Sequence, residues 1–159
     1  DEASNYLVHY GANKDSIYTY PYSTFFAKDV LDTPLSKEQK DKLKKEYDLP
    51  LNKIFLSASQ FIERKNIFQL LRVFKERNET LLLIGDGVQK EDYIKYIKEN
   101  NMQNVIMRDF MKHSDLINLM TACDYFITLS KEDIYGHTTN EAMARGLPVI
   151  SSNKVISSL

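Results

Sequence analysis

The chain has 159 residues, of which 43% are hydrophobic and 27% are charged, and its formal net charge is −1. This length and balance predict one soluble globular domain with a substantial core. The near-zero net charge argues against a nucleic-acid surface, which needs concentrated Lys and Arg. No apolar run approaches the ~18 residues that a membrane-spanning helix needs, and no secretory signal opens the chain. The single Cys123 cannot form an internal disulfide, so a reducing, cytoplasmic setting is expected.

The first 35 residues show little regular pattern. Alternation from Ser16 to Tyr20 predicts a strand that ends at Pro21. Residues 22–34 are expected to form a connection. The chain starts without Met and stops soon after a predicted strand, so we expect it to be one domain of a longer protein.

A charged helix is predicted over residues 37–48. Ser36 is a suitable N-cap, and Gln39 three residues later completes a capping box. Leu43 and Tyr47 are the helix's apolar side chains, so a solvated helix without a functional role for its lysines is expected.

From Lys53 onward, apolar strands alternate with amphipathic helices. The expected strands cover residues 54–58, 81–84, 105–107, 125–129 and 149–150. Four helices are expected between these strands. The first starts after an Asn66 cap, and the second follows residues 85–87 and runs to about Asn100. The third starts after a Ser114 cap, and the fourth runs from Thr138 or Thr139 to Gly146. Such alternation predicts an α/β fold, a three-layer Rossmann-like domain with a mostly parallel sheet and helices on both faces.

Ligands of open parallel sheets bind beyond the carboxyl ends of the strands. Three loops leave those ends with functional side chains, at residues 59–65, 85–87 and 130–138. In the first, Arg64 and Lys65 offer two cations to a phosphate, or form a solvated pair. In the second, Gly85 and Gly87 allow close approach to a ligand, or form an ordinary turn. Lys90 occupies the third glycine position of a dinucleotide fingerprint, which argues against an NAD-dependent oxidoreductase.

The third loop has the strongest features of a binding site. Gly136 before a helix N-terminus could turn backbone N–H groups toward an anion. His137 could donate to a phosphate or a sugar hydroxyl, or be an ordinary loop histidine. Thr138 and Glu141 match a capping box, which would give Glu141 a purely structural role, and Asp133 could be only a loop acid. Two carboxylates beside a phosphate-binding turn also suit a nucleotide-sugar.

A metal centre is not expected. The three histidines, His9, His113 and His137, are far apart in the sequence, and none has a paired ligand at metal-binding spacing.

Several segments together resemble a known family, in that family's order. They are residues 55–66 with Lys65, residues 83–87, residues 104–106, Leu119 with Asp124, and residues 133–148. From about Tyr6 to Leu159 the chain resembles the C-terminal, donor-binding domain of a family 4 glycosyltransferase, which has the GT-B architecture of two Rossmann-like domains. The resemblance implies that residues 1–159 form this one domain, with residues 1–35 as interdomain connection and first strand. The N-terminal acceptor domain and the final C-terminal segment would then be absent.

The resemblance implies retaining transfer of a sugar from a nucleotide-sugar without a catalytic metal. The family's signature is two glutamates separated by seven residues; Glu141 matches the second and would hold the donor ribose. Asp133, one methylene shorter, stands in place of the first and would face the donor sugar and its leaving phosphate. Gly136 and His137, with Thr138 beside them, would present N–H groups to the diphosphate.

The same resemblance assigns the other binding residues. Lys65 matches the phosphate-binding lysine, whereas Gln60 stands where the family has an arginine, and Arg64 could replace that charge. The backbone near Phe110 and Met111 would border the base. Gly85 and Gly87 lie in the matching segment of residues 83–87.

The resemblance also implies substrates and setting. A UDP-sugar is the favoured donor, with GDP- or ADP-sugars as alternatives. A glycan or lipid-linked acceptor would bind the absent domain, through which the full-length protein could touch the inner face of the membrane. Synthesis of a bacterial surface polysaccharide or other glycan is expected, and the chain alone should bind nucleotide weakly without turnover. The alternative is a catalytically inactive Rossmann-like domain that binds a partner, an interpretation motivated by Gln60 and Asp133.

Overall fold

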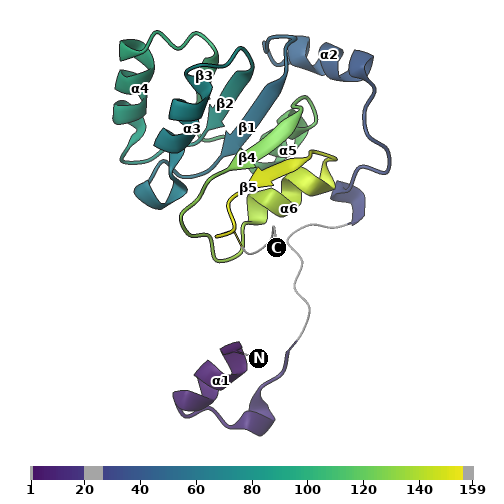
Figure 1. Ribbon diagram of the computed structural model, residues 1–159. Helices are drawn as coiled ribbons and strands as arrows, with labels where there is room; N and C mark the ends of the chain where they lie inside the picture. Colours follow the sequence, from purple (N-terminus) through teal and green to yellow (C-terminus); the bar gives the residue numbers. More distant parts are fainter. Residues whose placement is uncertain (1, 20–26, 156–159) are drawn as a thin grey trace.

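The computed structural model describes residues 2–19 and 27–155 and contains a parallel five-stranded sheet between two layers of helices (Figure 1). The strands are β1 (Ile54–Ala58), β2 (Thr80–Ile84), β3 (Val105–Arg108), β4 (Tyr125–Thr128) and β5 (Val149–Ser151). The α-helices are α1 (Glu2–His9), α2 (Lys37–Glu46), α3 (Ile67–Phe74), α4 (Lys90–Glu99), α5 (His113–Met120) and α6 (His137–Ala144). Short 3-10 helices cover Lys14–Ser16, Ala27–Asp29 and Glu63–Lys65.

The order of the strands in the sheet is β3-β2-β1-β4-β5. From β1 the chain first builds β2 and β3 on one side, and then crosses back to place β4 and β5 on the other. Phe55 pairs with Tyr125, and Leu56 with Phe126, so β1 and β4 are direct neighbours. The direction of winding reverses between these two strands. That reversal is the topological switch point, where ligands of open α/β sheets bind.

The core has two parts, one on each face of the sheet. Leu82 and Ile84 of β2 pack in one cluster with residues of α2, α5 and α6. Leu81 and Leu83 of the same strand pack in the other cluster with residues of α3 and α4. Because adjacent strand residues point to opposite faces, the continuous apolar run of β2 serves both layers. The predicted three-layer α/β fold is confirmed.

The α3 prediction is confirmed in detail, because the apolar stripe of Ile67, Leu70, Leu71 and Phe74 is buried. Asn66 does precede the helix, but it is in a left-handed conformation (φ 56°) and its side chain makes no cap hydrogen bond.

The predictions for residues 1–35 need correction. Residues 2–9 form α1, which was not predicted; Gly11, with φ 96°, follows its end as glycine often follows a helix. The strand predicted from Ser16 is wrong over the described residues, since Lys14–Ser16 is a 3-10 helix and residues 17–19 are irregular. Its expected end at Tyr20 and Pro21, and the start of the expected connection at residue 22, lie outside the described residues.

The charged helix α2 is present with its predicted capping box, since the Ser36 and Gln39 side chains each accept the other's backbone N–H. The expectation that its lysines are all solvated is wrong. Lys44 is only 3% exposed, and its Nζ lies 2.7 Å from Asp124 Oδ2. Lys40 Nζ donates to the Cys123 carbonyl at 2.8 Å. Two lysines therefore fasten α2 to the start of β4, an arrangement that a charge pattern alone does not reveal.

Two other helices begin earlier than predicted. Helix α5 starts at His113 after an Lys112 N-cap without a side-chain hydrogen bond, so Ser114 is not its cap. Helix α6 starts at His137 after Gly136, which has φ 74°. Thr138 is thus inside the first turn, and the capping box suggested for Glu141 does not form.

Candidate functional site

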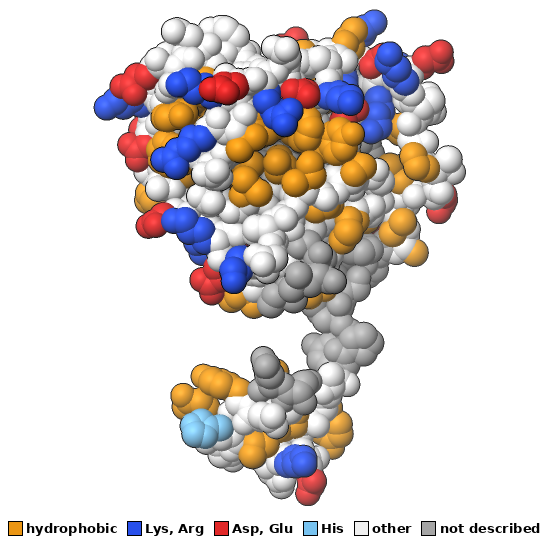
Figure 2. Space-filling model, in the orientation of Figure 1, with side chains coloured by type: hydrophobic (Ala, Val, Ile, Leu, Met, Phe, Trp, Pro, Cys, Tyr) orange, Lys and Arg blue, Asp and Glu red, His pale blue; other side chains and the backbone are white. Residues whose placement is uncertain are grey.

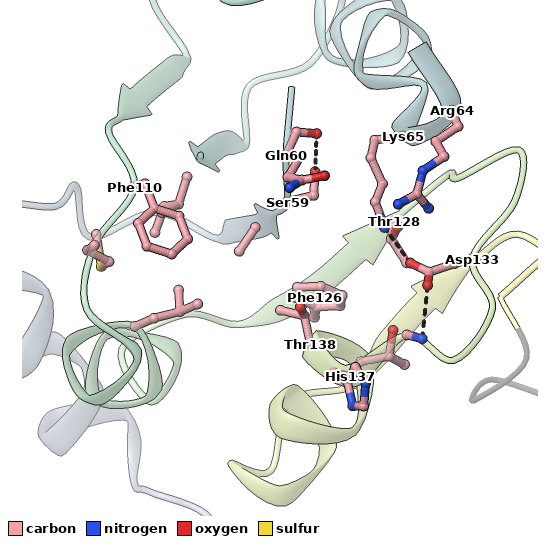
Figure 3. Close-up of a pocket in the computed structure, with 16 residues that line it drawn as sticks. Ser59, Gln60, Arg64, Lys65, Phe110, Phe126, Thr128, Asp133, His137 and Thr138 are labelled. Carbon is pink, nitrogen blue, oxygen red and sulfur yellow. Dashed lines mark hydrogen bonds and ion pairs between the residues drawn. The ribbon is translucent and has the colours of Figure 1, made fainter. Parts of the chain in front are cut away.

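A cavity of about 350 Å³ opens at the carboxyl ends of β1, β2 and β4, beside the switch point. Its two ends differ in chemistry. The apolar end is lined by Ala58, Ile84, Phe110, Met111, Leu116 and Phe126. The polar end is lined by Ser59, Gln60, Arg64, Lys65, Thr128, Asp133 and residues 136–139. In Figure 3, Phe110 lies across the cavity from Lys65 and Asp133, with Phe126 between them. A ligand with a flat apolar part and an anionic part fits this division.

Lys65 and Asp133 meet at the polar end. Lys65 Nζ donates to Asp133 Oδ2 at 2.5 Å, and the Gly136 N–H donates to the other carboxylate oxygen at 3.0 Å (Figure 3). The side chains of the pair are only 14% and 18% exposed, respectively. One carboxylate thus joins the loop after β1 to the start of α6.

This environment sets the charge of Asp133. Burial acts to raise the pKa of its carboxyl, but the hydrogen bond and charge of Lys65, with the N–H groups of Gly136 and Tyr135, outweigh that effect. The pKa of Asp133 is therefore held below its ordinary value, and the side chain is a carboxylate at neutral pH.

The loops after β1 and β4 are fastened together by further hydrogen bonds. The Lys131 N–H donates to the Arg64 carbonyl at 2.8 Å, and Asn66 Nδ2 donates to the Leu129 carbonyl at 3.1 Å. The Arg64 guanidinium reaches the Glu132 carbonyl at 3.4 Å. Arg64 also lines the cavity, and Figure 3 shows its guanidinium on the same side as Lys65. Both cations of this loop therefore lie at the polar end.

The Gly85–Gly87 turn approaches the protein's own backbone closely. The Phe61 N–H donates to the Asp86 carbonyl at 2.8 Å, and the Ser59 N–H to the Ile84 carbonyl at 3.0 Å. A Cβ on Gly85 would lie 1.9 Å from the Ser59 carbonyl oxygen, and one on Gly87 would lie 2.6 Å from that of Phe61. These contacts account for both glycines without a ligand. The turn shapes the loop that carries Gln60.

Glu141 lies in α6, 9% exposed, and has a partner that the sequence did not suggest. His113 Nε2 at the start of α5 lies 2.9 Å from Glu141 Oε1. The imidazole is 65% exposed, so it covers the carboxylate from the solvent side. This contact ties the N-terminus of α5 to α6.

Most of the predicted site residues line one cavity. They are Gln60, Arg64, Lys65, Phe110, Met111, Asp133, Gly136, His137 and Thr138. Gly85, Gly87 and Glu141 are not among its lining residues. His137 also contacts the Tyr135 ring, with centroids 4.6 Å apart.

Other residues that line the cavity, among them Leu116, Phe126 and Thr128, were not among the predicted site residues. The alternation of β4 could have identified two of them, because Phe126 and Thr128 are two positions apart and share a face. Leu116 lies in α5, and no local pattern places it beside the cavity.

Other features bear on the remaining expectations. Within residues 2–19 and 27–155, no group of three or more His, Cys, Asp or Glu is placed to hold a metal ion. Among the same described residues, no helix combines the length and apolar character needed to cross a membrane. Figure 2 shows acidic and basic side chains interspersed around a central hydrophobic area on the visible face.

Comparison with known proteins gives several relatives of similar sequence. An O-antigen biosynthesis glycosyltransferase, WclY of Escherichia coli, is 26% identical over 153 residues, covering 92% of this chain and 43% of that protein. An N-acetyl-alpha-D-glucosaminyl L-malate synthase of Bacillus anthracis is 28% identical over 122 residues, covering 73% of this chain and 32% of the relative. The chain thus spans less than half the length of these relatives.

Solved structures match the fold. The Anabaena protein Alr3699/HepE, in complex with UDP and glucose, superimposes with a TM-score of 0.74 at 21% identity, covering 98% of this chain and 43% of that one. The lipopolysaccharide outer core galactosyltransferase WaaB, in its apo form, gives a TM-score of 0.64 at 19% identity, covering 96% of this chain and 41% of that one.

The family assignment rests on a direct match to a family model. The model for glycosyl transferases group 1 matches residues 39–157, which include every strand of the sheet and the whole cavity. The resemblance noted from the sequence is confirmed: this chain belongs to the glycosyl transferases group 1 family.

Proposed function

We propose that this chain is the donor-binding domain of a retaining glycosyltransferase and that its cavity holds a nucleotide-sugar. One observation carries the proposal: the cavity at the switch point joins an apolar end to an end with two cations and a helix N-terminus. A nucleoside diphosphate has the same polarity along its length. The family match supports the reaction class.

The cavity suggests where each part of the donor binds. The diphosphate lies against Lys65, Arg64 and the first turn of α6, where Thr138 offers one of the N–H groups that helices leave without intrahelical partners. The base lies toward Phe110 and Met111. In this arrangement Arg64 supplies the positive charge that Gln60 lacks.

The two acidic residues receive the roles that the family resemblance implies. Glu141 binds the ribose hydroxyls, held in place by His113. Asp133 is directed toward the donor sugar. Glu141 does not line the cavity. Its role therefore requires a modest movement of the first turn of α6 when the donor binds, with the His113 contact kept.

The chemistry that follows is stabilisation of a leaving group. Transfer breaks the bond between the anomeric carbon and the diphosphate, so negative charge grows on the departing phosphate oxygens. Lys65 and Arg64, with the N-terminus of α6, are fixed close to that charge before the reaction starts. The proposal assigns charge stabilisation to these groups and gives no step to a metal.

UDP-sugars are the favoured donors, supported by the UDP in the Alr3699/HepE complex, with GDP- and ADP-sugars as alternatives. The acceptor, a glycan or a lipid-linked glycan, would bind a second, N-terminal domain of a longer polypeptide. The chain's share of its relatives' length supports this arrangement. The chain alone would then bind nucleotide without turnover, in the cytoplasm or at the inner face of the membrane, in synthesis of a bacterial surface polysaccharide.

A specific observation supports a second candidate, an inactive domain that binds a partner. Gln60 and Asp133 depart from the family pattern, and Asp133 pairs with Lys65, the lysine proposed to bind the diphosphate. Screening the full-length polypeptide for release of nucleoside diphosphate across a panel of donors distinguishes the two. The inactive-domain hypothesis predicts that every nucleotide-sugar stays intact.

Calorimetric titration of the chain with UDP, GDP and ADP tests the donor site. Lys65→Met should weaken diphosphate binding by about tenfold or more, because a charge-assisted hydrogen bond contributes about 1.5–3 kcal/mol. Lys131→Met is the matched control, since Lys131 is an exposed lysine of the neighbouring loop that does not line the cavity. It should change affinity less than twofold. Absence of binding at millimolar nucleotide, in the full-length polypeptide too, contradicts the proposal.

A further inference from the structure

We infer that Asp133 is an internal competitor of the donor's diphosphate: its carboxylate occupies the anion position of the site, and the donor must displace it. This inference rests on the proposed function and adds a control of affinity to it. It follows from the positions of the groups that hold Asp133.

Asp133 accepts hydrogen bonds from both kinds of group that would bind an incoming phosphate, a lysine and a backbone N–H at a helix start. Lys65 Nζ, the cation proposed for the diphosphate, donates to Oδ2 at 2.5 Å. The Gly136 N–H, at the start of α6, donates to Oδ1 at 3.0 Å. A carboxylate between an ammonium group and the N-terminus of a helix has the surroundings of a bound phosphate oxygen. The protein's own side chain therefore fills that position.

The length of the side chain makes this arrangement possible. Asp133 reaches the N–H three residues later in its own loop, a short-range contact typical of aspartate in turns. The backbone of Asp133 is fixed independently, because its N–H donates to the Lys154 carbonyl at 3.0 Å beside the bridge to Val155. Displacement by a ligand thus needs rotation of one side chain and no movement of the loop.

The negative charge of Asp133 lowers the affinity of the site for a diphosphate. The carboxylate is ionised at neutral pH, and it lines the same cavity as Lys65 and Arg64. A diphosphate that enters therefore meets a cation that is already neutralised, and it also meets a like charge. Both effects lower affinity for the anionic part of the donor, whereas neither acts on the base or the ribose.

The test compares Asp133→Asn with the wild-type chain in titrations with UDP and with uridine. UDP should bind about five- to tenfold more tightly to Asp133→Asn, the size expected when an ion pair worth about 1 kcal/mol no longer competes. Uridine, which has no phosphate, should bind equally to both. Glu132→Gln removes the same charge one residue away, outside the cavity lining, and should leave UDP affinity within twofold. Asp133→Glu, which keeps the charge, should not reproduce the gain.

Equal or weaker binding of UDP by a folded Asp133→Asn variant overturns the inference, as does an equal gain for uridine. Should that variant fail to fold, the wild-type chain supplies the measurement by NMR. Saturation with UDP should shift the Gly136 amide resonance as Asp133 leaves it, and an unchanged resonance at saturation also overturns the inference. If wild type and variant bind no nucleotide at all, the proposed donor site fails instead, which separates the two failures.

Discussion

The buried Asp124 network offers the sharpest prediction about stability. Lys44 Nζ lies 2.7 Å from Asp124 Oδ2, and the Ile54 N–H donates to the same oxygen at 2.9 Å. Lys40 Nζ lies 3.9 Å from Oδ1. The carboxylate therefore connects α2, β1 and the start of β4. We consider the change Asp124→Asn, which keeps the volume and removes the charge.

The expected cost follows from burial. The Lys44 side chain is 4% exposed, and without the carboxylate its ammonium group keeps the Asn52 carbonyl, 2.9 Å away, as its described hydrogen-bond partner. Removing one partner of a buried pair costs about 3–5 kcal/mol, because the other charge stays buried without compensation. Asp124 itself is 22% exposed, so water can reach the network and the loss should fall at or just below the lower end of that range. A loss of about 2–3 kcal/mol is expected, or roughly 4–12 °C in melting temperature.

Urea unfolding followed by circular dichroism measures this loss. Glu46→Gln is the matched control, because Glu46 forms the exposed ion pair with Lys42 at 3.9 Å on the same helix. Such surface pairs contribute about 0–1 kcal/mol. Lys44→Met with Asp124→Asn should recover part of the loss, since the double variant buries no lone charge. Equal costs for Asp124→Asn and Glu46→Gln would refute the argument that α2 is fastened through a buried charge.

Four more predictions concern single positions. Gly85→Ala should destabilise the chain by about 2 kcal/mol or more, measured by urea unfolding, because its Cβ would meet a carbonyl oxygen at 1.9 Å. His113→Ala should reduce the preference for UDP over its 2′-deoxy analogue in calorimetry, since it frees the proposed ribose-binding carboxylate of Glu141. Burial raises the pKa of the Cys123 thiol to about 12, so iodoacetamide should label it slowly in the native chain at pH 8 and rapidly in urea. Folding lowers the pKa of Asp133, so its contribution to stability is complete above its ordinary pKa and disappears as acid protonates it. The urea midpoint of Asp133→Asn should therefore fall less steeply below pH 4 than that of wild type.

Much of the fold followed from local sequence pattern. The sequence predicts β1, β2 and α3 directly. Burial on both faces of a strand requires a continuous apolar run, and burial of one helix face requires apolar residues at helical spacing. The caps were less predictable. Asn66 looks like an N-cap, yet its side chain donates across the site to the Leu129 carbonyl, 63 residues later. Tertiary hydrogen bonds of this kind compete with local capping and leave no mark in the neighbouring residues.

In the candidate site, too, the sequence predicted individual residues but not the contacts between them. Sequence pattern and family resemblance named Lys65, Asp133 and Glu141, but not that the first two would pair or that His113 would contact the third. Lys65 and Asp133 are 68 positions apart, and they meet because β1 and β4 are neighbours at the switch point. Chain order places β2 and β3 between them, so distance along the sequence conceals the contact.

The switch point also accounts for the position of Asp133 between a cation and a helix N-terminus. The loops after β1 and β4 form one surface, on which cations come from one loop and helix N–H groups from the other. A carboxylate between them can bridge both sources of positive potential, and a short one can do so within its own turn. The groups proposed to bind a diphosphate on this surface are thus the groups that hold Asp133. Under the proposed function, affinity for the donor depends on the difference between two similar anions, so a change of charge at position 133 should alter that affinity more than the same change at Glu132.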